Sequence, residues 1–154
     1  MVEAIKVAGF IKTSAVDGPG IRSVLFFQGC SRNCPDCHNK DISNKNGGIN
    51  VTIKDVVQYI KKNCKNKKLT ISGGEPLEQL EGLYELLKEL KEEGFDLCLY
   101  TGFDRNNVPE FITECLHYLK SGRFVKEMMY PTKAFVGSYN QKFVKICDRI
   151  DEED

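Results

Sequence analysis

Hydrophobic and polar residues form two kinds of pattern along the chain, continuous apolar runs and apolar residues at helical spacing. Each pattern predicts one type of secondary structure. Residues 21–27, IRSVLFF, form a mostly apolar run typical of a buried strand, and two further strands are predicted for KLTIS at 68–72 and FDLCLYTG at 95–102. Between them, apolar residues recur at helical spacing in VTIKDVVQYIKK, residues 51–62, and in PLEQLEGLYELLKELKEEG, residues 76–94. Strands that alternate with helices predict an α/β fold with a mostly parallel sheet and outer helices.

Local signals set the ends of the predicted helices. Thr52 and Asp55 make an acidic variant of the capping box at the start of the first helix. The second helix stops at Gly94, and we expect five residues on its apolar face: Leu77, Leu80, Tyr84, Leu87 and Leu90. Residues 108–122, VPEFITECLHYLKSG, begin beside a proline and are expected to form a third helix that ends near Gly122.

The length of the chain restricts the architecture. With 154 residues we expect one domain, 1–154. A complete eight-fold βα barrel takes about 200–250 residues or more, so a partial barrel with fewer βα units fits better.

The net charge and the lengths of the apolar runs argue against binding to nucleic acid and against a membrane span. Lys and Arg number 22, as do Asp and Glu, so a net charge of zero gives no reason to expect nucleic acid or an anionic membrane surface. No run approaches the roughly 20 apolar residues of a membrane span, and the first residues do not resemble a signal peptide, so we expect a cytoplasmic protein. Thiols there are mostly reduced or bind metal. Four cysteines far apart in sequence are expected to be buried or idle thiols: Cys64, Cys98, Cys115 and Cys147.

The other three cysteines, Cys30, Cys34 and Cys37, lie within eight residues in the segment GCSRNCPDCHN. Four chemistries use cysteines at such spacing. They are haem attachment through C-x-x-C-H, a C-x-x-C redox pair, a zinc site and an iron–sulfur cluster that lacks one protein ligand.

Three of these interpretations leave something unexplained. Haem attachment requires export, and both haem attachment and a redox pair leave Cys30 without a role. A structural zinc site needs four ligands, usually in two pairs. His38 directly follows Cys37, and two adjacent residues do not readily bind the same tetrahedral zinc ion. A four-iron cluster held by three thiolates keeps one iron open for a substrate or cofactor, which gives three ligands a purpose.

Two motifs together resemble a known family. The spacing of the three cysteines matches the loop of radical S-adenosylmethionine (SAM) enzymes, and LTISGGEPL, residues 69–77, places Gly73-Gly74-Glu75-Pro76 at the end of the next strand. DGPGIRSVLFFQGC, residues 17–30, is similar to the N-terminus of glycyl-radical-enzyme activases. LYTGF at 99–103 and FVGSYNQ at 135–141 are similar to activating proteins of anaerobic ribonucleotide reductases.

The resemblance implies a partial barrel of the radical SAM type and two cofactors. Cys30, Cys34 and Cys37 would hold three irons of a [4Fe–4S] cluster, and the amino and carboxylate groups of SAM would chelate the fourth. One electron would cleave SAM to methionine and a 5′-deoxyadenosyl radical, which would remove an α-hydrogen from a glycine of a partner protein.

The same resemblance implies contacts to SAM. Gly73 and Gly74 would offer backbone groups to its amino end, and Glu75 would pair with its ammonium. Glu75 can also act as a helix N-terminal carboxylate, and the two roles are compatible. Three residues of the cysteine segment are expected near the adenine: Asp36, Cys37 and His38. Thr101 and Tyr100 are expected on the ribose side because ligands bind at the carboxyl ends of strands in such sheets.

The resemblance implies two partners. One is a large glycyl-radical protein, for which we expect the anaerobic ribonucleotide reductase, and the other is a flavodoxin-like reductant. Asn140 and Gln141 are placed near the partner or the SAM carboxylate by resemblance alone, and His117 is expected to be structural. Ser121 stands where reductase activators often carry an acidic residue. The alternatives are an activase of another glycyl-radical enzyme such as pyruvate formate-lyase, or a non-catalytic iron–sulfur or zinc binding module.

Overall fold

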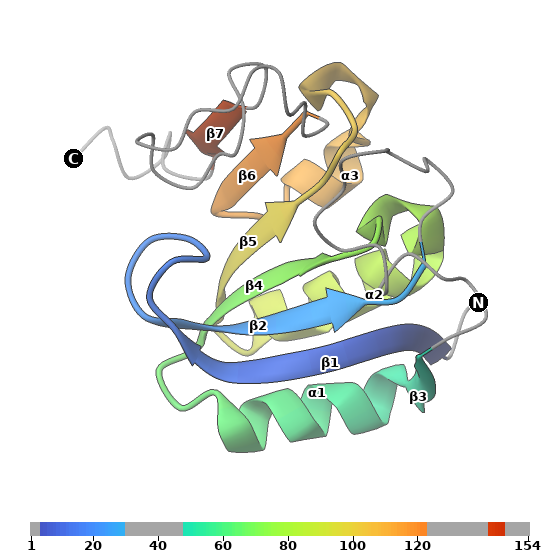
Figure 1. The fold of residues 1–154 in the computed structure, drawn as a ribbon, viewed down its shortest axis with the longest axis vertical. Coiled ribbons are helices and arrows are strands. Elements are labelled where there is room, and N and C mark those ends of the chain that lie inside the picture. The colour runs from blue at the N-terminus through green and yellow to red at the C-terminus, as the bar shows by residue number, and fades with distance from the viewer. Residues whose placement is uncertain (1–3, 30–47, 123–141, 147–154) are drawn as a thin grey trace.

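The structure is a computed structural model that describes residues 4–29, 48–122 and 142–146 (Figure 1). Its elements, in chain order, are β1 (Ala4–Ser14), β2 (Arg22–Phe27), β3 (Ile49–Thr52), α1 (Ile53–Asn63), β4 (Lys68–Gly73), η1 (Pro76–Gln79), α2 (Leu80–Glu92), β5 (Asp96–Tyr100), η2 (Arg105–Asn107), α3 (Glu110–Thr113), β6 (Tyr118–Ser121) and β7 (Lys142–Lys145). No helix of the described residues is long and apolar enough to span a membrane.

The strands form one mixed sheet in the order β3-β1-β2-β4-β5-β6-β7. The four central strands, β2, β4, β5 and β6, are parallel, whereas β1, β3 and β7 join antiparallel at the two edges. The expected α/β fold with a mostly parallel central sheet is therefore confirmed. The parallel strands bring the ends of β2, β4 and β5, and whatever follows them, to one edge of the sheet.

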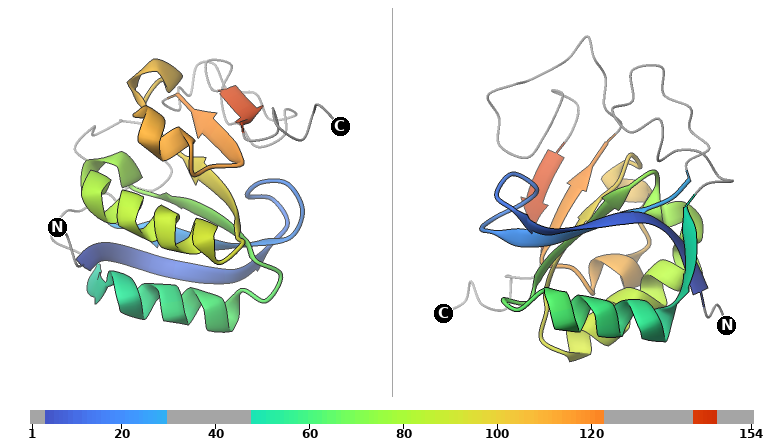
Figure 2. Two further views of the ribbon diagram at one scale, coloured as in Figure 1. Left: turned by 180° about the vertical axis from the view of Figure 1, so that it is seen from behind. Right: turned by 60° about the horizontal axis from the view of Figure 1, so that its bottom comes forward.

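Helices α1 and α2 lie on the same side of this sheet (Figure 2). They bury apolar side chains against strand residues such as Leu25, Ile71 and Leu99, and Ile112 of α3 belongs to the same core. Because side chains alternate along a strand, the residues between these point to the opposite side. We call that side the helix-free face, because α1 and α2 of the described residues lie on the other side. It carries Val24, Thr70, Cys98, Tyr100, Tyr118 and Lys120.

The strands expected within 21–27, 68–72 and 95–102 are present, as is the first helix with its cap. Thr52 is the N-cap of α1, and its side chain accepts a hydrogen bond from Asp55 N at 3.0 Å. This contact satisfies one of the backbone donors that a helix start leaves open.

The predicted helix over 108–122 is wrong in its second half. Helix α3 covers only Glu110–Thr113, and Tyr118–Ser121 form β6 between β5 and β7. Leu119 is fully buried in the core there. Pairing with two neighbouring strands outweighs the weak helical pattern of the sequence.

The second helix differs in its start and in its apolar face. The chain first makes the 3-10 turn η1, and α2 begins at Leu80. The residues of α2 that are fully buried are Leu83, Leu86, Leu87 and Leu90, whereas Leu80 and Tyr84 are only half-buried. The antiparallel strands β1, β3 and β7 were not predicted from the sequence.

Candidate functional site

Of the residues predicted to contact SAM, the structure describes Gly73, Gly74, Glu75, Tyr100 and Thr101. Cys30, Cys34, Asp36, Cys37 and His38 lie outside the described residues, as do Asn140, Gln141 and Cys147. Within the described ranges no group of three or more His, Cys, Asp or Glu side chains is placed to hold a metal ion. The roles predicted for the cysteine segment therefore remain predictions.

The glycine pair after β4 closes directly onto the end of β2. Gly74 N donates to Phe27 O at 3.0 Å, and Glu75 N donates to Gly29 O at 2.8 Å. Gly29 is the residue that precedes Cys30. These two hydrogen bonds bring the Gly-Gly-Glu-Pro motif and Gly29, the first residue of the cysteine segment, together.

Both positions need glycine because of this close approach. Gly73 has a φ of +124°, which side chains rarely tolerate, and a Cβ there would lie 2.2 Å from Phe27 O. A Cβ on Gly74 would lie 2.2 Å from Gly29 O. The space that these glycines leave is thus filled by protein backbone, and their contact with SAM stays a prediction.

Gly48 marks where the described chain resumes after the cysteine segment. It has a φ of +81°, and a Cβ there would lie 2.7 Å from both the Gln28 side chain and Val7 O. Gly48 therefore lies beside Gln28, although residues 30–47 separate it from Gly29 in the sequence.

Glu75 is buried, with 1% of its surface exposed, and joins the ends of two parallel strands. Its Oε2 accepts from Leu77 N at 3.0 Å and from Thr101 Oγ1 at 2.7 Å, and its Oε1 accepts from Gly102 N at 2.7 Å. It is the N-cap of η1, which confirms the helix-terminal role expected from the sequence. Its pairing with the SAM ammonium remains a prediction.

Thr101 is a partner of this carboxylate. It is also buried, and its hydroxyl accepts from Phe103 N at 3.1 Å while it donates to Glu75. The residues at the ends of β4 and β5 therefore form one hydrogen-bonded unit. Glu75 and Thr101 were each predicted as site residues from the sequence, but the hydrogen bond between them was not.

The helix-free face carries buried polar side chains below this edge. Burial raises the pKa of the Cys98 thiol to about 12, against weaker opposing effects of Arg22 and Thr70. Burial also raises the pKa of Tyr100, and it lowers the pKa of the neighbouring Lys120 ammonium. The groups on this face are therefore held in a poorly hydrated environment.

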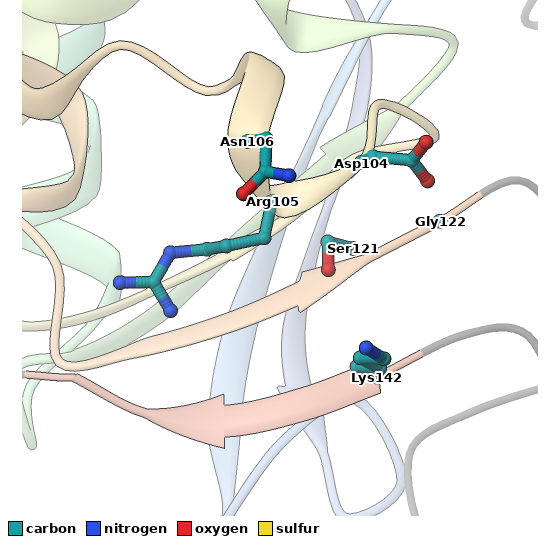
Figure 3. A pocket seen from close by; sticks show the side chains of 6 residues that line it. All are labelled: Asp104, Arg105, Asn106, Ser121, Gly122 and Lys142. Atoms are coloured by element: carbon teal, nitrogen blue, oxygen red, sulfur yellow. The ribbon is translucent and has the colours of Figure 1, made fainter.

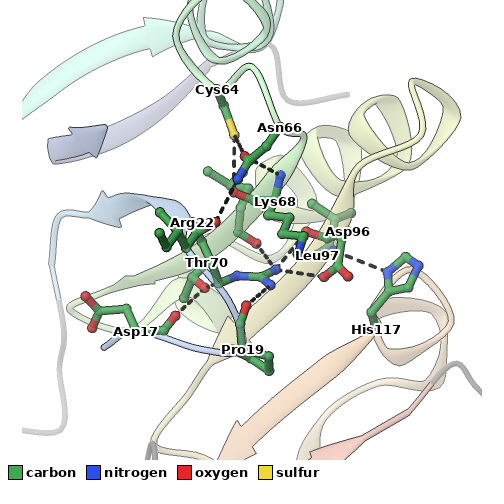
Figure 4. A network of polar contacts seen from close by, with 12 residues as sticks. Asp17, Pro19, Arg22, Cys64, Asn66, Lys68, Thr70, Asp96, Leu97 and His117 are labelled. Atoms are coloured by element: carbon green, nitrogen blue, oxygen red, sulfur yellow. Dashed lines mark hydrogen bonds and ion pairs between the residues drawn. The ribbon is translucent and has the colours of Figure 1, made fainter. Parts of the chain in front are cut away.

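Arg22, which sequence analysis did not single out, ties the other end of the sheet together (Figure 4). Its side chain is fully buried. Its guanidinium donates to Thr70 Oγ1 at 2.9 Å, to Pro19 O at 2.9 Å, and to Asp96 O and Oδ1 at 2.8 Å each. The segment DGPGIR, residues 17–22, thus contains both Arg22 and the Pro19 carbonyl that Arg22 binds. The same segment is also held to β4, because Asp17 O accepts from Thr70 Oγ1 at 2.6 Å.

His117 is structural, as expected, because its Nδ1 accepts from Leu97 N at 3.2 Å.

A polar surface pocket of about 210 Å³ lies beyond the ends of β5 and β6 (Figure 3). Its lining residues are Asp104, Arg105, Asn106, Ser121, Gly122 and Lys142. Charged side chains thus flank the site edge.

Comparison with known proteins identifies the family. Residues 16–144 match the model of the 4Fe-4S single cluster domain. The chain belongs to this family. The matched range contains Cys30, Cys34 and Cys37 together with the Gly-Gly-Glu-Pro motif.

Similar proteins of known function are activating enzymes. The chain is 37% identical over 110 residues to the pyruvate formate-lyase 1-activating enzyme of Escherichia coli (strain K12), which covers 68% of this chain and 45% of that protein. It is 39% identical over 103 residues to the pyruvate formate-lyase-activating enzyme of Clostridium pasteurianum, 63% of this chain and 43% of that one. The chain thus spans less than half the length of these relatives.

A further relative matches almost end to end. The chain is 31% identical over 137 residues to the anaerobic ribonucleoside-triphosphate reductase-activating protein of Escherichia coli (strain K12), 82% of this chain and 89% of that protein. The resemblance to glycyl-radical-enzyme activases is therefore confirmed. It supports the two expected cofactors, a [4Fe–4S] cluster and SAM.

Proposed function

We propose that this protein is a radical SAM activase that generates a glycyl radical on a separate enzyme. The observation that carries the proposal is the joining of its two motifs. The hydrogen bonds from Gly74 and Glu75 to Phe27 and Gly29 set the Gly-Gly-Glu-Pro turn against the residue before Cys30. In a family named for a single 4Fe-4S cluster, this arrangement supports a cluster and a co-substrate that share one edge of the sheet.

In this proposal Cys30, Cys34 and Cys37 hold the cluster. The amino end of SAM is bound by Gly73, Gly74 and Glu75. The adenine contacts residues 36–38, and Thr101 lies on the ribose side. When bound, the two cofactors supply one-electron cleavage of SAM and removal of a hydrogen atom from glycine. The described residues supply placement, because the bonds among Glu75, Thr101 and Gly102 fix the ends of β4 and β5 relative to each other.

The proposed fold is a partial barrel in a single domain, 1–154. The four parallel strands with helices on one side support it, because the helix-free face would then be the interior of the barrel. The proposed location is the cytoplasm, with a flavodoxin-like protein as the electron donor.

We infer that the partner is the anaerobic ribonucleotide reductase. The match to its activating protein covers 89% of that relative, whereas the matches to pyruvate formate-lyase activases cover less than half of theirs. The higher identity to the latter, 37% against 31%, favours pyruvate formate-lyase as the second candidate. A non-catalytic iron–sulfur or zinc module is the remaining alternative.

Electron paramagnetic resonance of the candidate partner tests the proposal. Reduced, reconstituted protein is mixed with SAM and the reductase under exclusion of oxygen, and the doublet of a glycyl radical is expected on the reductase. Cys34→Ala should abolish the signal, whereas Cys98→Ala, a buried thiol of the helix-free face, should retain it. A signal on pyruvate formate-lyase alone would overturn the partner, and a colourless protein that binds zinc would overturn the activity.

A further inference from the structure

The surface pocket beyond β5 and β6 is connected to the carboxyl edge of the sheet by a short series of hydrogen bonds. Thr101 Oγ1, which donates to Glu75, accepts from Phe103 N at 3.1 Å, and Phe103 O accepts from Gly122 N at 2.9 Å. Gly122 lines the pocket, as do residues 104–106, which follow Phe103 directly. A protein loop that reaches this edge therefore passes close to the pocket.

One side chain of the pocket is buried and has an open hydrogen-bonding group. Ser121 is 4% exposed and lines the pocket, and within the described part of the chain its hydroxyl forms no hydrogen bond (Figure 3). Lys142 lies directly opposite Ser121 in the pairing of β6 with β7, so both side chains leave the sheet on the same side. Buried hydroxyls are usually hydrogen-bonded, so the pocket offers a donor for which a ligand can supply the acceptor.

The charged groups around this hydroxyl leave an excess of one positive charge. Arg105 and Lys142 are cationic, Asp104 is anionic, and all three residues are exposed. Among the described residues none of the three forms an ion pair. In Figure 3 the side chains of Asp104 and Arg105 point in opposite directions. A single negative charge would therefore balance the pocket.

The volume of the pocket restricts what it can hold. Sites for small molecules and cofactors usually measure about 300–1,000 Å³. This pocket has only about 210 Å³, so it suits one side chain of another protein better than a nucleotide or a cofactor. Aspartate and glutamate carboxylates accept from ammonium, guanidinium and hydroxyl groups, and such charge-assisted hydrogen bonds are the strong ones.

We propose that the surface pocket binds an acidic side chain of the glycyl-radical partner. This inference rests on the proposed function, because the glycine of the partner has to reach the carboxyl edge of the sheet. In the complex Lys142 and Arg105 donate to the carboxylate, and Ser121 donates its hydroxyl. Asp104 repels a more highly charged group such as a phosphate, so the pocket selects a single negative charge.

Binding of the protein to its partner tests the pocket. The dissociation constant is measured with each of the two candidates, the anaerobic ribonucleotide reductase and pyruvate formate-lyase. For the candidate that binds, Lys142→Met and Arg105→Met should each weaken binding about 3- to 10-fold. Ser121→Ala should weaken it about 2- to 5-fold, because neutral hydrogen bonds are weaker than charged ones. The losses from the two charged residues should shrink at high salt.

Lys54→Met is the matched control. Lys54 is an exposed lysine of α1, which packs on β1 and β3 at the opposite end of the strand order. Its removal should leave the affinity for the partner unchanged. Cleavage of SAM in the absence of the partner should be unchanged in Lys142→Met, because the pocket lies outside the residues proposed to bind SAM.

An exchange of charges identifies the carboxylate. Lys142→Glu should weaken binding at least about 10-fold, because it places two acidic groups together. Acidic residues of the partner near its radical glycine are then changed to lysine one at a time. One of these substitutions should restore the affinity of Lys142→Glu to within about three-fold of the original complex, since direct neighbours show coupled energies.

Each outcome decides between the hypotheses. If the unmodified protein binds neither candidate and forms no glycyl radical, the proposed function fails and the pocket proposal fails with it. If the radical forms and all pocket variants bind the partner as tightly as the unmodified protein, the proposed function stands and the pocket proposal is overturned. If the variants bind weakly but no lysine of the partner restores Lys142→Glu, the pocket does not hold a carboxylate of the partner, and the proposal is overturned as well.

Discussion

At the scale of single residues, the surroundings of a side chain decide its chemistry. Cys98 is a thiol with no exposed surface, and burial holds its pKa near 12, well above the ordinary 9.0. A protonated thiol is a poor nucleophile and a poor metal ligand. Cys98 therefore differs from any cysteine that has to bind iron as a thiolate.

The raised pKa of Cys98 predicts a loss of stability in alkali. The folded state holds the thiol proton more tightly than the unfolded state, so its contribution is complete below pH 9 and is lost as the pH rises toward 12. Between pH 8 and pH 10 the loss should be about 1.4 kcal/mol. Urea unfolding at both values measures it, and Cys98→Ala should decline less by this amount. An equal decline in both proteins would contradict the assignment.

Glu75 shows what sequence can and cannot reveal about a residue. Its motif identified it as a site residue and as a helix cap, and the cap is confirmed. Its bond to Thr101 joins positions 26 residues apart. That contact depends on the parallel pairing of β4 with β5, and no local pattern in the chain specifies which strands pair.

At the scale of elements, predictions succeeded where a run of residues has one dominant signal. The apolar strand β2 and the capped helix α1 are of this kind. Strand β6 was missed because its four residues follow a short helix and have a mixed polar pattern. Its strand conformation comes from its neighbours β5 and β7, which are separated from it in the sequence.

The turn between β4 and η1 yields a prediction of its own. Gly74→Ala would place a Cβ 2.2 Å from Gly29 O, so the motif and the start of the cysteine segment have to separate. We expect a loss of about 1–3 kcal/mol or more in stability, as for other overpacked positions, together with reduced iron content after reconstitution. Thermal unfolding and iron analysis are the measurements.

Gly9→Ala is the matched control for this variant. Gly9 also lies in the sheet region, in β1, but nothing lies within 4 Å of the position of its Cβ. Its stability should stay within about 0.5 kcal/mol of the unmodified protein. If Gly74→Ala behaved like Gly9→Ala, the close contact with Gly29 would be wrong.

At the scale of the whole molecule, two buried charged residues hold the parallel strands together at opposite ends. Glu75 joins β4 and β5 at the carboxyl edge, and Arg22 joins β2, β4 and β5 at the amino edge. The architecture thus depends on a few polar contacts as well as on its apolar core.

Arg22→Met tests the amino-edge clamp. Its loss leaves Pro19 O, Thr70 and Asp96 without their donor, and we expect a fall of about 2–4 kcal/mol in the free energy of unfolding. The value lies below that of a fully buried pair because the Asp96 side chain keeps 32% of its exposure. Urea unfolding measures the change, and Arg105→Met, an exposed arginine of the surface pocket, should change stability by less than about 0.5 kcal/mol.

The position of Gly48 beside Gln28 has a consequence for how the protein tolerates changes in length. The two residues are neighbours in the structure, although residues 30–47 come between them in the sequence. The entropy cost of joining two such points grows only slowly with the number of residues between them. We therefore expect that adding or removing a few residues between Gly29 and Gly48 changes the stability of the sheet by little.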